Sequence, residues 1–347
     1  MRVLIVGAGA IGSLLGHRLA SAGHAVTLVG RAPWVKAIQS QGLGLEEKNS
    51  VLFQTNLTAV ASVTDVTGNA FDLLVCTTKV YDTAEAIHQV ARSAVGRVPL
   101  LILQNGVGGE ELAAGALPQA PRLAGIITLP VKVLSPGLIR LAATSGGIGL
   151  AAASPEAPVD DLVVTLRQAG FGEVKSYADY RAMRWSKLLL NMLGNAVPTI
   201  LDMPPDKIYG QRRLFDLERA AFCEALAVMR ALGLKPVCLP GYPVPLLAWG
   251  MSRLPGAVLH PLFRRFIVGG RGGKMPSLHL DLLKGKQKSE VDFLNGAVAD
   301  HARRIRLGAP VNHALHSTLQ AIVSGDLPWA EFQGQPQKLL ARIGWPA

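Results

Sequence analysis

A glycine-rich turn near the N-terminus places the strongest constraint on the fold of this chain. The apolar run Val3-Leu4-Ile5-Val6 predicts a buried strand, which leads directly into Gly7-Ala8-Gly9-Ala10-Ile11-Gly12, a GxGxxG pattern that opens a helix over 13–22. In such turns the first glycine permits a tight turn, the second lets the backbone approach a pyrophosphate, and the third lets the helix pack on the strand. The pyrophosphate then lies at the helix N-terminus, where free N–H groups point outward. A second strand over 25–29 completes the pattern, which predicts a dinucleotide-binding unit.

Residue 31 indicates which dinucleotide binds. NAD-binding proteins of this type usually end the second strand with an acidic residue that binds the ribose 2′-hydroxyl. This chain has Gly30-Arg31 there instead, and its first acidic residue is Glu46. A guanidinium suits a 2′-phosphate because it carries a permanent charge and a fork of donors. The sequence therefore favours NADP(H) over NAD(H), the alternative being that Arg31 is a solvated loop residue.

Length and composition predict a folded protein of two domains. The chain has 347 residues, of which 49% are hydrophobic and 17% charged, enough for a large core and against disorder. No signal segment opens it and no uninterrupted apolar run could span a membrane, so we expect a cytoplasmic protein. The cysteines at 76, 223 and 238 are far apart and odd in number, which predicts reduced, mostly buried thiols.

The net charge of +11 is concentrated in one segment. Residues 253–288 hold eight Lys or Arg against the single acid Asp281. No aromatic interleaving accompanies them, which favours a solvated basic face or a field for anionic cofactor and substrate over nucleic acid. The passage 236–274 is rich in Pro and Gly and has no assigned structure, and its apolar character favours a homodimer.

Strand and helix signals divide the chain near residue 178. Predicted strands over 51–55, 71–77, 99–103 and 123–128 alternate with helices, which indicates a mostly parallel sheet. A hairpin of 138–141 with 147–150, a helix over 159–168 and a strand over 173–177 follow. Further helices are predicted over 180–193, 213–232, 277–283 and 290–306. We therefore expect an α/β Rossmann-type domain over 1–178 and an all-α domain over 179–347.

Two polar residues follow predicted strands at the edge where open α/β sheets bind ligands. Lys79 follows the strand 71–77, and Asn105 follows 99–103 in the run Gln104-Asn105-Gly106-Val107-Gly108. We expect both to lie near the nicotinamide half of a bound dinucleotide. The alternatives are a surface lysine and a simple Asn-Gly turn.

Three polar residues recur at helical spacing in an apolar segment. Lys187, Asn191 and Asn195 are four residues apart, which predicts that they share one helix face. Asparagine is a poor helix former, so two of them on one face indicate hydrogen bonds to a polar ligand rather than a solvated face. A lysine in a partly apolar site can protonate the alkoxide that forms when hydride adds to a ketone. By themselves, Ser277 is more typical of a helix N-cap and Glu290 of a first-turn acid. No metal-binding histidine spacing and no GxSxG motif competes with this interpretation.

Taken together, these segments resemble the ketopantoate reductase (2-dehydropantoate 2-reductase) family. The matching segments are GAGAIG at 7–12, Arg31, Lys79, QNGVG at 104–108, WSKLLLNMLGN at 185–195, SEVDFLNG at 289–296 and GAPVN at 308–312. The similarity spans almost the whole chain. Two departures are a slightly longer interval between Asp281 and Glu290 and a longer, more apolar passage over 236–274.

The resemblance implies a role for each matching residue. Lys187 would be the general acid and contact the substrate, with Asn191, Asn195 and Ser277 as further substrate ligands. NADPH would be bound by Gly7, Ala8, Gly9, Ala10, Ile11, Gly12, Arg31, Lys79, Asn105, Val131 and Glu290. The implied reaction is the NADPH-dependent reduction of 2-dehydropantoate to (R)-pantoate in pantothenate synthesis. The alternatives are a reductase of another branched or aromatic 2-oxo acid and a non-catalytic NADP(H)-binding regulatory protein.

Overall fold

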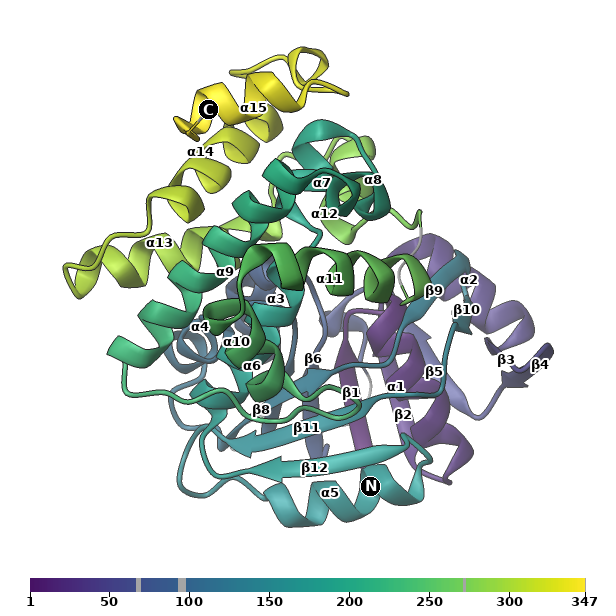
Figure 1. The fold of residues 1–347 in the computed structure, drawn as a ribbon. Coiled ribbons are helices and arrows are strands. Elements are labelled where there is room, and N and C mark those ends of the chain that lie inside the picture. The colour runs from purple at the N-terminus through teal and green to yellow at the C-terminus, as the bar shows by residue number, and fades with distance from the viewer. Residues whose placement is uncertain (67–69, 93–97, 271–272, 347) are drawn as a thin grey trace. The chain divides into compact units, whose positions relative to one another are not determined.

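The computed structural model describes residues 1–66, 70–92, 98–270 and 273–346, which fold into two compact units (Figure 1). The α/β unit comprises Met1–Gln104, Gly108–Met183 and Leu239–Tyr242, and the helical unit comprises Asn105–Val107, Arg184–Cys238 and Pro243–Ala347. The first unit contains a mostly parallel sheet, a smaller sheet and helices, and the second consists mainly of helices. The predicted fold class is therefore confirmed.

The α/β unit holds every named strand of the described chain. The strands are β1 (Arg2–Val6), β2 (Ala25–Val29), β3 (Leu43–Glu47), β4 (Ser50–Gln54), β5 (Leu57–Val60), β6 (Leu73–Cys76), β7 (Leu100–Leu103), β8 (Arg122–Ile127), β9 (Val131–Ser135), β10 (Leu138–Leu141), β11 (Gly147–Ala152) and β12 (Glu173–Tyr177). The helices are α1 (Ala10–Ser21), α2 (Ala32–Gln41), α3 (Thr83–Arg92), α4 (Gly109–Ala116) and α5 (Val159–Gln168), with the 3₁₀ helices η1 (Val63–Asp65) and η2 (Val80–Asp82).

The helical unit begins within α6 (Tyr180–Met192). Its other helices are α7 (Ala196–Leu201), α8 (Pro205–Gly210), α9 (Arg212–Ala231), α10 (Val244–Arg253), α11 (Gly256–Gly270), α12 (Ser277–Leu283), α13 (Asn295–Arg304), α14 (Pro310–Ser324) and α15 (Pro336–Ile343), with the 3₁₀ helices η3 (Glu290–Phe293) and η4 (Trp329–Glu331). The unit is organised around α9, against which α8, α10, α11, α13 and α14 pack. The passage 236–274, unassigned from sequence, contains α10 and α11.

Eight strands form the large sheet, in the order β12-β11-β8-β7-β6-β1-β2-β5. The central strand β1 pairs in parallel with β2 and β6, whereas β11 runs antiparallel to β8. From β1 the chain moves outward through β2 and β5, then returns to β6 on the other side of β1. The strand order thus reverses between β1 and β6, and open α/β sheets bind ligands outside the carboxyl ends of the strands at such a reversal. There β1 leads into Gly7 and β6 into Thr77.

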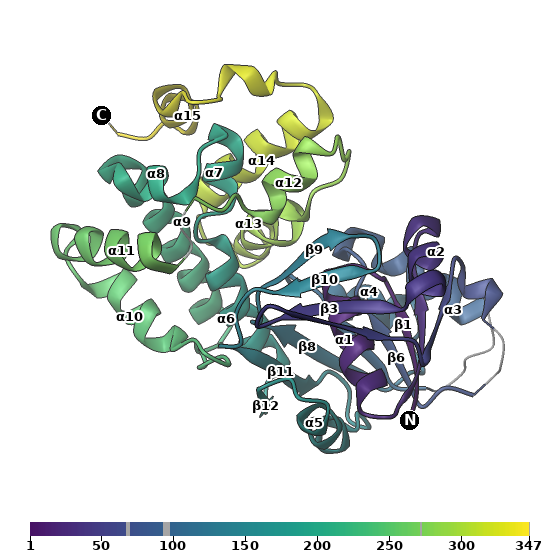
Figure 2. The ribbon, with the colours of Figure 1, turned by 90° about the vertical axis from the view of Figure 1, so that its right-hand side faces the viewer.

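Alternating residues of β1 enter two separate cores, as the two-residue period of a strand requires. Val3 and Ile5 belong to a core completed by α1, α2, α5 and the smaller sheet, while Leu4 and Val6 belong to a core completed by α3 and α4. All four side chains are almost fully buried. Helices therefore cover both faces of the large sheet (Figure 2).

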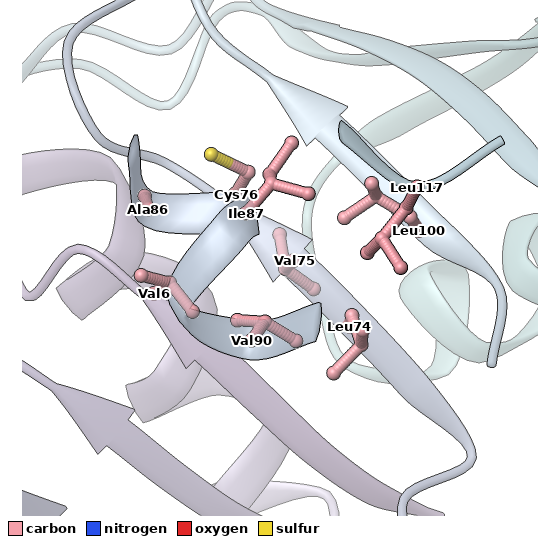
Figure 3. Close-up of a pocket in the computed structure, with 9 residues that line it drawn as sticks. All are labelled: Val6, Leu74, Val75, Cys76, Ala86, Ile87, Val90, Leu100 and Leu117. Carbon is pink, nitrogen blue, oxygen red and sulfur yellow. The ribbon is translucent and has the colours of Figure 1, made fainter. Parts of the chain in front are cut away.

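A small pocket lies within the second core, between β6 and α3 (Figure 3). Its lining is apolar apart from one thiol and comprises Val6, Leu74, Val75, Cys76, Ala86, Ile87, Val90, Leu100 and Leu117. Burial raises the pKa of the Cys76 thiol, which is therefore uncharged at neutral pH. None of the predicted site residues lines the pocket, so we interpret it as imperfect packing of the core.

Four strands form the smaller sheet, in the order β4-β3-β10-β9. Lys48 and Asn49 join β3 to β4 with φ angles of 49° and 65°, the left-handed geometry of a two-residue hairpin turn. The predicted strand 51–55 corresponds to β4. The expectation that it joins the large parallel sheet is wrong, because β4 pairs antiparallel with β3 in the smaller sheet.

The predicted hairpin of 138–141 with 147–150 is wrong. Leu138–Leu141 pairs with β9 and β3, whereas Gly147–Ala152 pairs with β8 and β12 in the large sheet. The physical reason is a tighter turn upstream, where Pro136-Gly137, with Gly137 at a φ of 78°, folds β10 back on β9. The turn residues at 144–146 instead connect the two sheets.

In the part of the chain that the structure describes, no helix is both long and apolar enough to cross a membrane.

The three cysteines form no disulfide. Cys76 is buried, Cys223 is half-buried and Cys238 is exposed. The prediction of mostly buried thiols is therefore wrong for Cys238, which lies in the irregular segment between α9 and α10.

Candidate functional site

The glycine loop, defined as residues 7–12, follows β1 at the point where the strand order reverses. Gly7 has a φ of 116°, and the N–H groups of Gly7 and Ala8 both donate to the Val29 carbonyl at 3.0 Å. A Cβ on Gly7 would lie 2.8 Å from the carbonyl carbon of Thr77, and a Cβ on Gly12 would collide with the carbonyl oxygen of Gly7. The fold itself therefore requires the first and third glycines of the motif.

Gly9 differs from these two glycines because open space lies beside it. It is the N-cap of α1, with a φ of −79° that any residue can adopt, and a Cβ there would meet no atom within 4 Å. No side chain caps α1, and no acidic residue occupies its first turn. The first N–H groups of a helix have no intrahelical acceptor, and they attract anions. A pyrophosphate fits this position, because the bare glycine permits its close approach.

Gly9 and Gly12 are expected to respond differently to substitution by alanine. Gly9→Ala should shift the unfolding temperature by no more than about 2 °C. It should weaken dinucleotide binding at least about tenfold, because the new methyl group occupies the space of the pyrophosphate. Gly12→Ala should instead destabilise the fold by about 2–4 kcal/mol. Thermal unfolding and a cofactor titration measure both effects, and unchanged binding by Gly9→Ala would contradict the prediction.

Three further predicted cofactor residues lie in the α/β unit. Arg31 follows β2 as the N-cap of α2, is exposed, and has a guanidinium that bonds to no residue in the described part of the chain. Lys79 is half-buried and follows β6 as the N-cap of η2. Val131 is the first residue of β9 and pairs with Leu141 of β10. The glycine loop, Arg31 and Lys79 thus follow three neighbouring parallel strands at one edge of the large sheet, whereas Val131 lies in the smaller sheet.

Asn105 belongs to the helical unit. Its Oδ1 accepts a hydrogen bond from Nδ2 of Asn191 on α6 at 3.1 Å. Two residues later, the N–H of Val107 donates to the carbonyl of Phe293 on η3 at 3.1 Å. The loop that follows β7 is therefore anchored to two elements of the helical unit, and one of them carries the predicted Lys-Asn pair.

The predicted helix face is interrupted before its third member. Lys187 and Asn191 lie one turn apart on α6, as expected, but α6 ends at Met192. Gly194 adopts a φ of 62°, and Asn195 becomes the N-cap of α7. The expectation of one continuous face is therefore wrong for Asn195, because a left-handed glycine ends the helix. Its Nδ2 still donates to the Asn191 carbonyl at 3.0 Å, which keeps it beside α6.

Polar atoms of the asparagine cluster, defined as Asn105, Asn191 and Asn195, are available to a ligand. Oδ1 of Asn195 is buried without a hydrogen-bond partner among the described residues. Neither Nδ2 of Asn105 nor Oδ1 of Asn191 has a partner there. The half-buried Lys187 adds an amine one helical turn before Asn191. Together these groups offer acceptors, a donor and a cation, which suit an acid that also carries hydroxyl or oxo groups.

Glu218 supports this cluster and was not identified from sequence. Its carboxylate on α9 is 4% exposed and accepts hydrogen bonds from the Gly194 N–H at 2.7 Å and the Tyr209 hydroxyl at 2.8 Å. These two hydrogen bonds hold the turn that carries Asn195. The available signal was an acid on the apolar side of a helix, since buried acids are rare unless paired.

Ser277 is not the N-cap expected from sequence, whereas Glu290 lies in the first turn of a helix, as expected. Ser277 is the exposed first residue of α12, with Pro276 as the N-cap, so its prediction as an N-cap is wrong. Its hydroxyl bonds to no residue that the structure describes. Glu290 is 4% exposed and begins η3, which Leu294 separates from α13. The single helix expected over 290–306 is therefore two helices, because the backbone leaves helical geometry at Leu294, with a φ of −112° and a ψ of −99°.

Gly106 follows Asn105 and packs closely against η3 of the same unit. It has a φ of 88°, and a Cβ there would lie 2.7 Å from Cβ and 2.8 Å from the carbonyl oxygen of Phe293. We expect Gly106→Ala to cost about 1–3 kcal/mol of unfolding free energy and to reduce turnover, because Asn105 is displaced from Asn191. The control is Gly115→Ala on α4, where a Cβ meets no atom within 4 Å. Equal stability of the two variants in chemical denaturation would refute the argument.

Two family models match this chain in succession. The model described as "Ketopantoate reductase PanE/ApbA" matches residues 3–155, and its C-terminal counterpart matches residues 179–323. The chain belongs to the ketopantoate reductase family. The resemblance expected from sequence is therefore confirmed. Ketopantoate reductases are oxidoreductases.

Named relatives and solved structures agree with this membership. A 2-dehydropantoate 2-reductase of Pyrococcus horikoshii is 28% identical over 326 residues, covering 92% of this chain and 97% of the relative. A crystal structure of a PanE/ApbA family ketopantoate reductase from Ralstonia eutropha is 27% identical, has a TM-score of 0.79, and is matched over 94% of this chain and 99% of that one. D-mandelate dehydrogenase, solved with NADH and anilino(oxo)acetate, shares the fold at 22% identity and a TM-score of 0.79, over 94% of this chain and 99% of its own.

Proposed function

We propose that this protein catalyses the NADPH-dependent reduction of 2-dehydropantoate to (R)-pantoate, a step of pantothenate synthesis. Membership of the ketopantoate reductase family supports the reaction. The observation that carries the proposal is the hydrogen bond between Asn105 and Asn191 at 3.1 Å. It joins the residue after β7, where a dinucleotide site is expected, to the helix that presents Lys187.

We assign the dinucleotide to the glycine loop and to five further residues. The glycine loop would hold the pyrophosphate, and Arg31 at the N-terminus of α2 would hold the 2′-phosphate, since the first turn of α2 carries no acid. The full set is Gly7, Ala8, Gly9, Ala10, Ile11, Gly12, Arg31, Lys79, Asn105, Val131 and Glu290. The domain boundary that we propose lies between residues 178 and 179, with substrate contacts supplied by the second part.

The substrate is a 2-oxo acid with a hydroxyl group, and the helical unit supplies a partner for each of its polar groups. When bound, the nicotinamide supplies the hydride. The Lys187 ammonium donates a proton to the ketone oxygen as negative charge develops there, and solvent restores that proton afterwards. Asn191, Asn195 and Ser277 hold the carboxylate and the hydroxyl. The buried Oδ1 of Asn195 suits the hydroxyl, because an unpaired buried acceptor gains most from a donor.

A substrate panel tests this proposal. The initial rate of NADPH oxidation is measured with 2-dehydropantoate, with 2-oxoisovalerate, which lacks the hydroxymethyl group and so the hydroxyl, and with benzoylformate, which is aromatic. We expect kcat/KM to be about 10²–10⁴ times higher for 2-dehydropantoate than for 2-oxoisovalerate, because a site that hydrogen-bonds a hydroxyl rejects the analogue without it. Preference for benzoylformate would support another 2-oxo acid, and no oxidation with any of them would support a non-catalytic NADP(H)-binding protein.

We propose that α10 and α11 form the interface of a homodimer. Leu246 and Trp249 on α10 are 64% and 54% exposed, and Val258 and Leu262 on α11 are 50% and 58% exposed. Each pair lies on one helix face, and such apolar exposure is costly on a monomer. Light scattering should give twice the chain mass for the native protein and the chain mass for Leu246→Ser/Trp249→Ser. The exposed Val164→Ser control on α5 should stay dimeric, and a native monomer would exclude the interface.

A further inference from the structure

The side chain of Gln104 connects the ends of two neighbouring strands. Gln104 directly follows β7, is 8% exposed, and its Nε2 donates to the carbonyl of Thr78 at 2.8 Å and to the Thr78 hydroxyl at 3.1 Å. On the other side, its Oε1 accepts a hydrogen bond from the buried hydroxyl of Thr83 at 2.9 Å. A carbonyl oxygen can only accept, so the amide nitrogen must face Thr78. Both ends of the amide are therefore used.

The Thr78 carbonyl belongs to the peptide group that leads into Lys79. Fixing that carbonyl fixes the plane of the peptide, and with it the position of the Lys79 Cα atom. Lys79 is then the N-cap of η2, and its own carbonyl accepts from the Asp82 N–H at 2.9 Å. The short segment between β6 and η2 is thus held from both sides.

The same segment is also locked against the glycine loop. The Thr77 N–H donates to the Val6 carbonyl at 2.9 Å, and its hydroxyl donates to the Gly7 carbonyl at 2.7 Å. A Cβ on Gly7 would lie 2.8 Å from the backbone of Thr77 and Thr78, so the two segments are in close contact. A continuous set of hydrogen bonds therefore runs from Gln104 through residues 77–78 to the loop proposed to bind pyrophosphate.

We propose that Gln104 is a positioning residue that orients Lys79 and the adjacent segment for dinucleotide binding. This inference rests on the proposed dinucleotide site. Gln104 would act through Lys79 and not by touching the cofactor. A buried amide with every polar end satisfied is suited to this task, since losing either partner leaves an unpaired group in the interior.

The test is a double-mutant cycle with Gln104→Met and Lys79→Ala. Methionine keeps the volume of glutamine but removes its donors and acceptor. We expect Gln104→Met to raise the NADPH Kd and KM about tenfold, with kcat changed less than about threefold. In the Lys79→Ala background the same substitution should change Kd less than about twofold, because the residue through which it acts is gone. Gln119→Met, in an exposed turn of the same unit, is the matched control.

Two results would overturn the inference. An unchanged Kd in Gln104→Met, or a tenfold loss that is the same with and without Lys79, would show that Gln104 has no positioning role. If Gln104→Met does not fold, Thr83→Val serves instead, because it removes one partner of the amide and should raise Kd about threefold, whereas Thr83→Ser should not. Wild-type protein that binds no NADPH would refute the proposed function itself, which separates the two failures.

Discussion

Lys187→Ala is expected to lower kcat for 2-oxo acid reduction by about 10²–10⁴, the range typical for loss of a general acid. The substitution removes the Nζ group that protonates the developing alkoxide. Alanine is the best helix former, and Lys187 lies within α6, so the fold should persist. The NADPH Kd, measured by fluorescence titration, should stay within about threefold of the native value, because the lysine acts on the substrate.

Two further variants sharpen the result for Lys187. Lys187→Arg keeps the positive charge but holds its proton too tightly to act as an acid, so it should be nearly as slow as the alanine variant. Lys207→Ala, at an exposed position on α8 of the same unit, should behave like the native protein. Turnover of Lys187→Ala within about threefold of the native rate would remove Lys187 from the mechanism.

Arg31→Ala is expected to raise the KM for NADPH about 10–100-fold and the KM for NADH less than about twofold. The guanidinium has no other partner among the described residues, so its removal should affect only a ligand that carries the 2′-phosphate. The effect on NADPH should shrink at high salt, since the contact is exposed.

The matched control for Arg31 is Lys36→Ala. Lys36 lies on the same helix, is exposed, and carries the same charge. A general effect of positive charge would appear in both variants, whereas a specific phosphate contact would appear only in Arg31→Ala. Equal changes of KM for NADPH and NADH in Arg31→Ala would contradict the 2′-phosphate assignment.

Local periodicity predicted the regular elements of the fold well. The strands Ala25–Val29 and Glu173–Tyr177 and the helices Val159–Gln168 and Ser277–Leu283 have the predicted bounds, because each has a clear apolar period and a turn residue at its ends. Pairing depends on contacts distant in sequence. The partner of Leu138–Leu141 was therefore wrong, although Pro136-Gly137 carried the turn signal that identifies β9.

The helical unit shows the limit of sequence reasoning about the site. Equal spacing predicted Lys187, Asn191 and Asn195 on one helix face. Spacing alone does not show that the helix ends before Asn195, at the left-handed Gly194. The hydrogen bond of Asn191 to Asn105 joins residues that no local pattern relates. The supporting residues Glu218 and Gln104 were missed for the same reason, since a buried polar residue is recognised by its partners and not by its neighbours in sequence.

The central claim is that hydride passes from NADPH to the ketone carbon of 2-dehydropantoate. It is tested most directly with NADPH carrying deuterium at both positions of the nicotinamide C4. The native protein is incubated with this cofactor and 2-dehydropantoate, and the pantoate is analysed by mass spectrometry and chiral chromatography. We predict (R)-pantoate with one deuterium at C2, formed in equal amount to the NADPH consumed. Consumption of NADPH without deuterated pantoate, or no consumption at all, would contradict the claim.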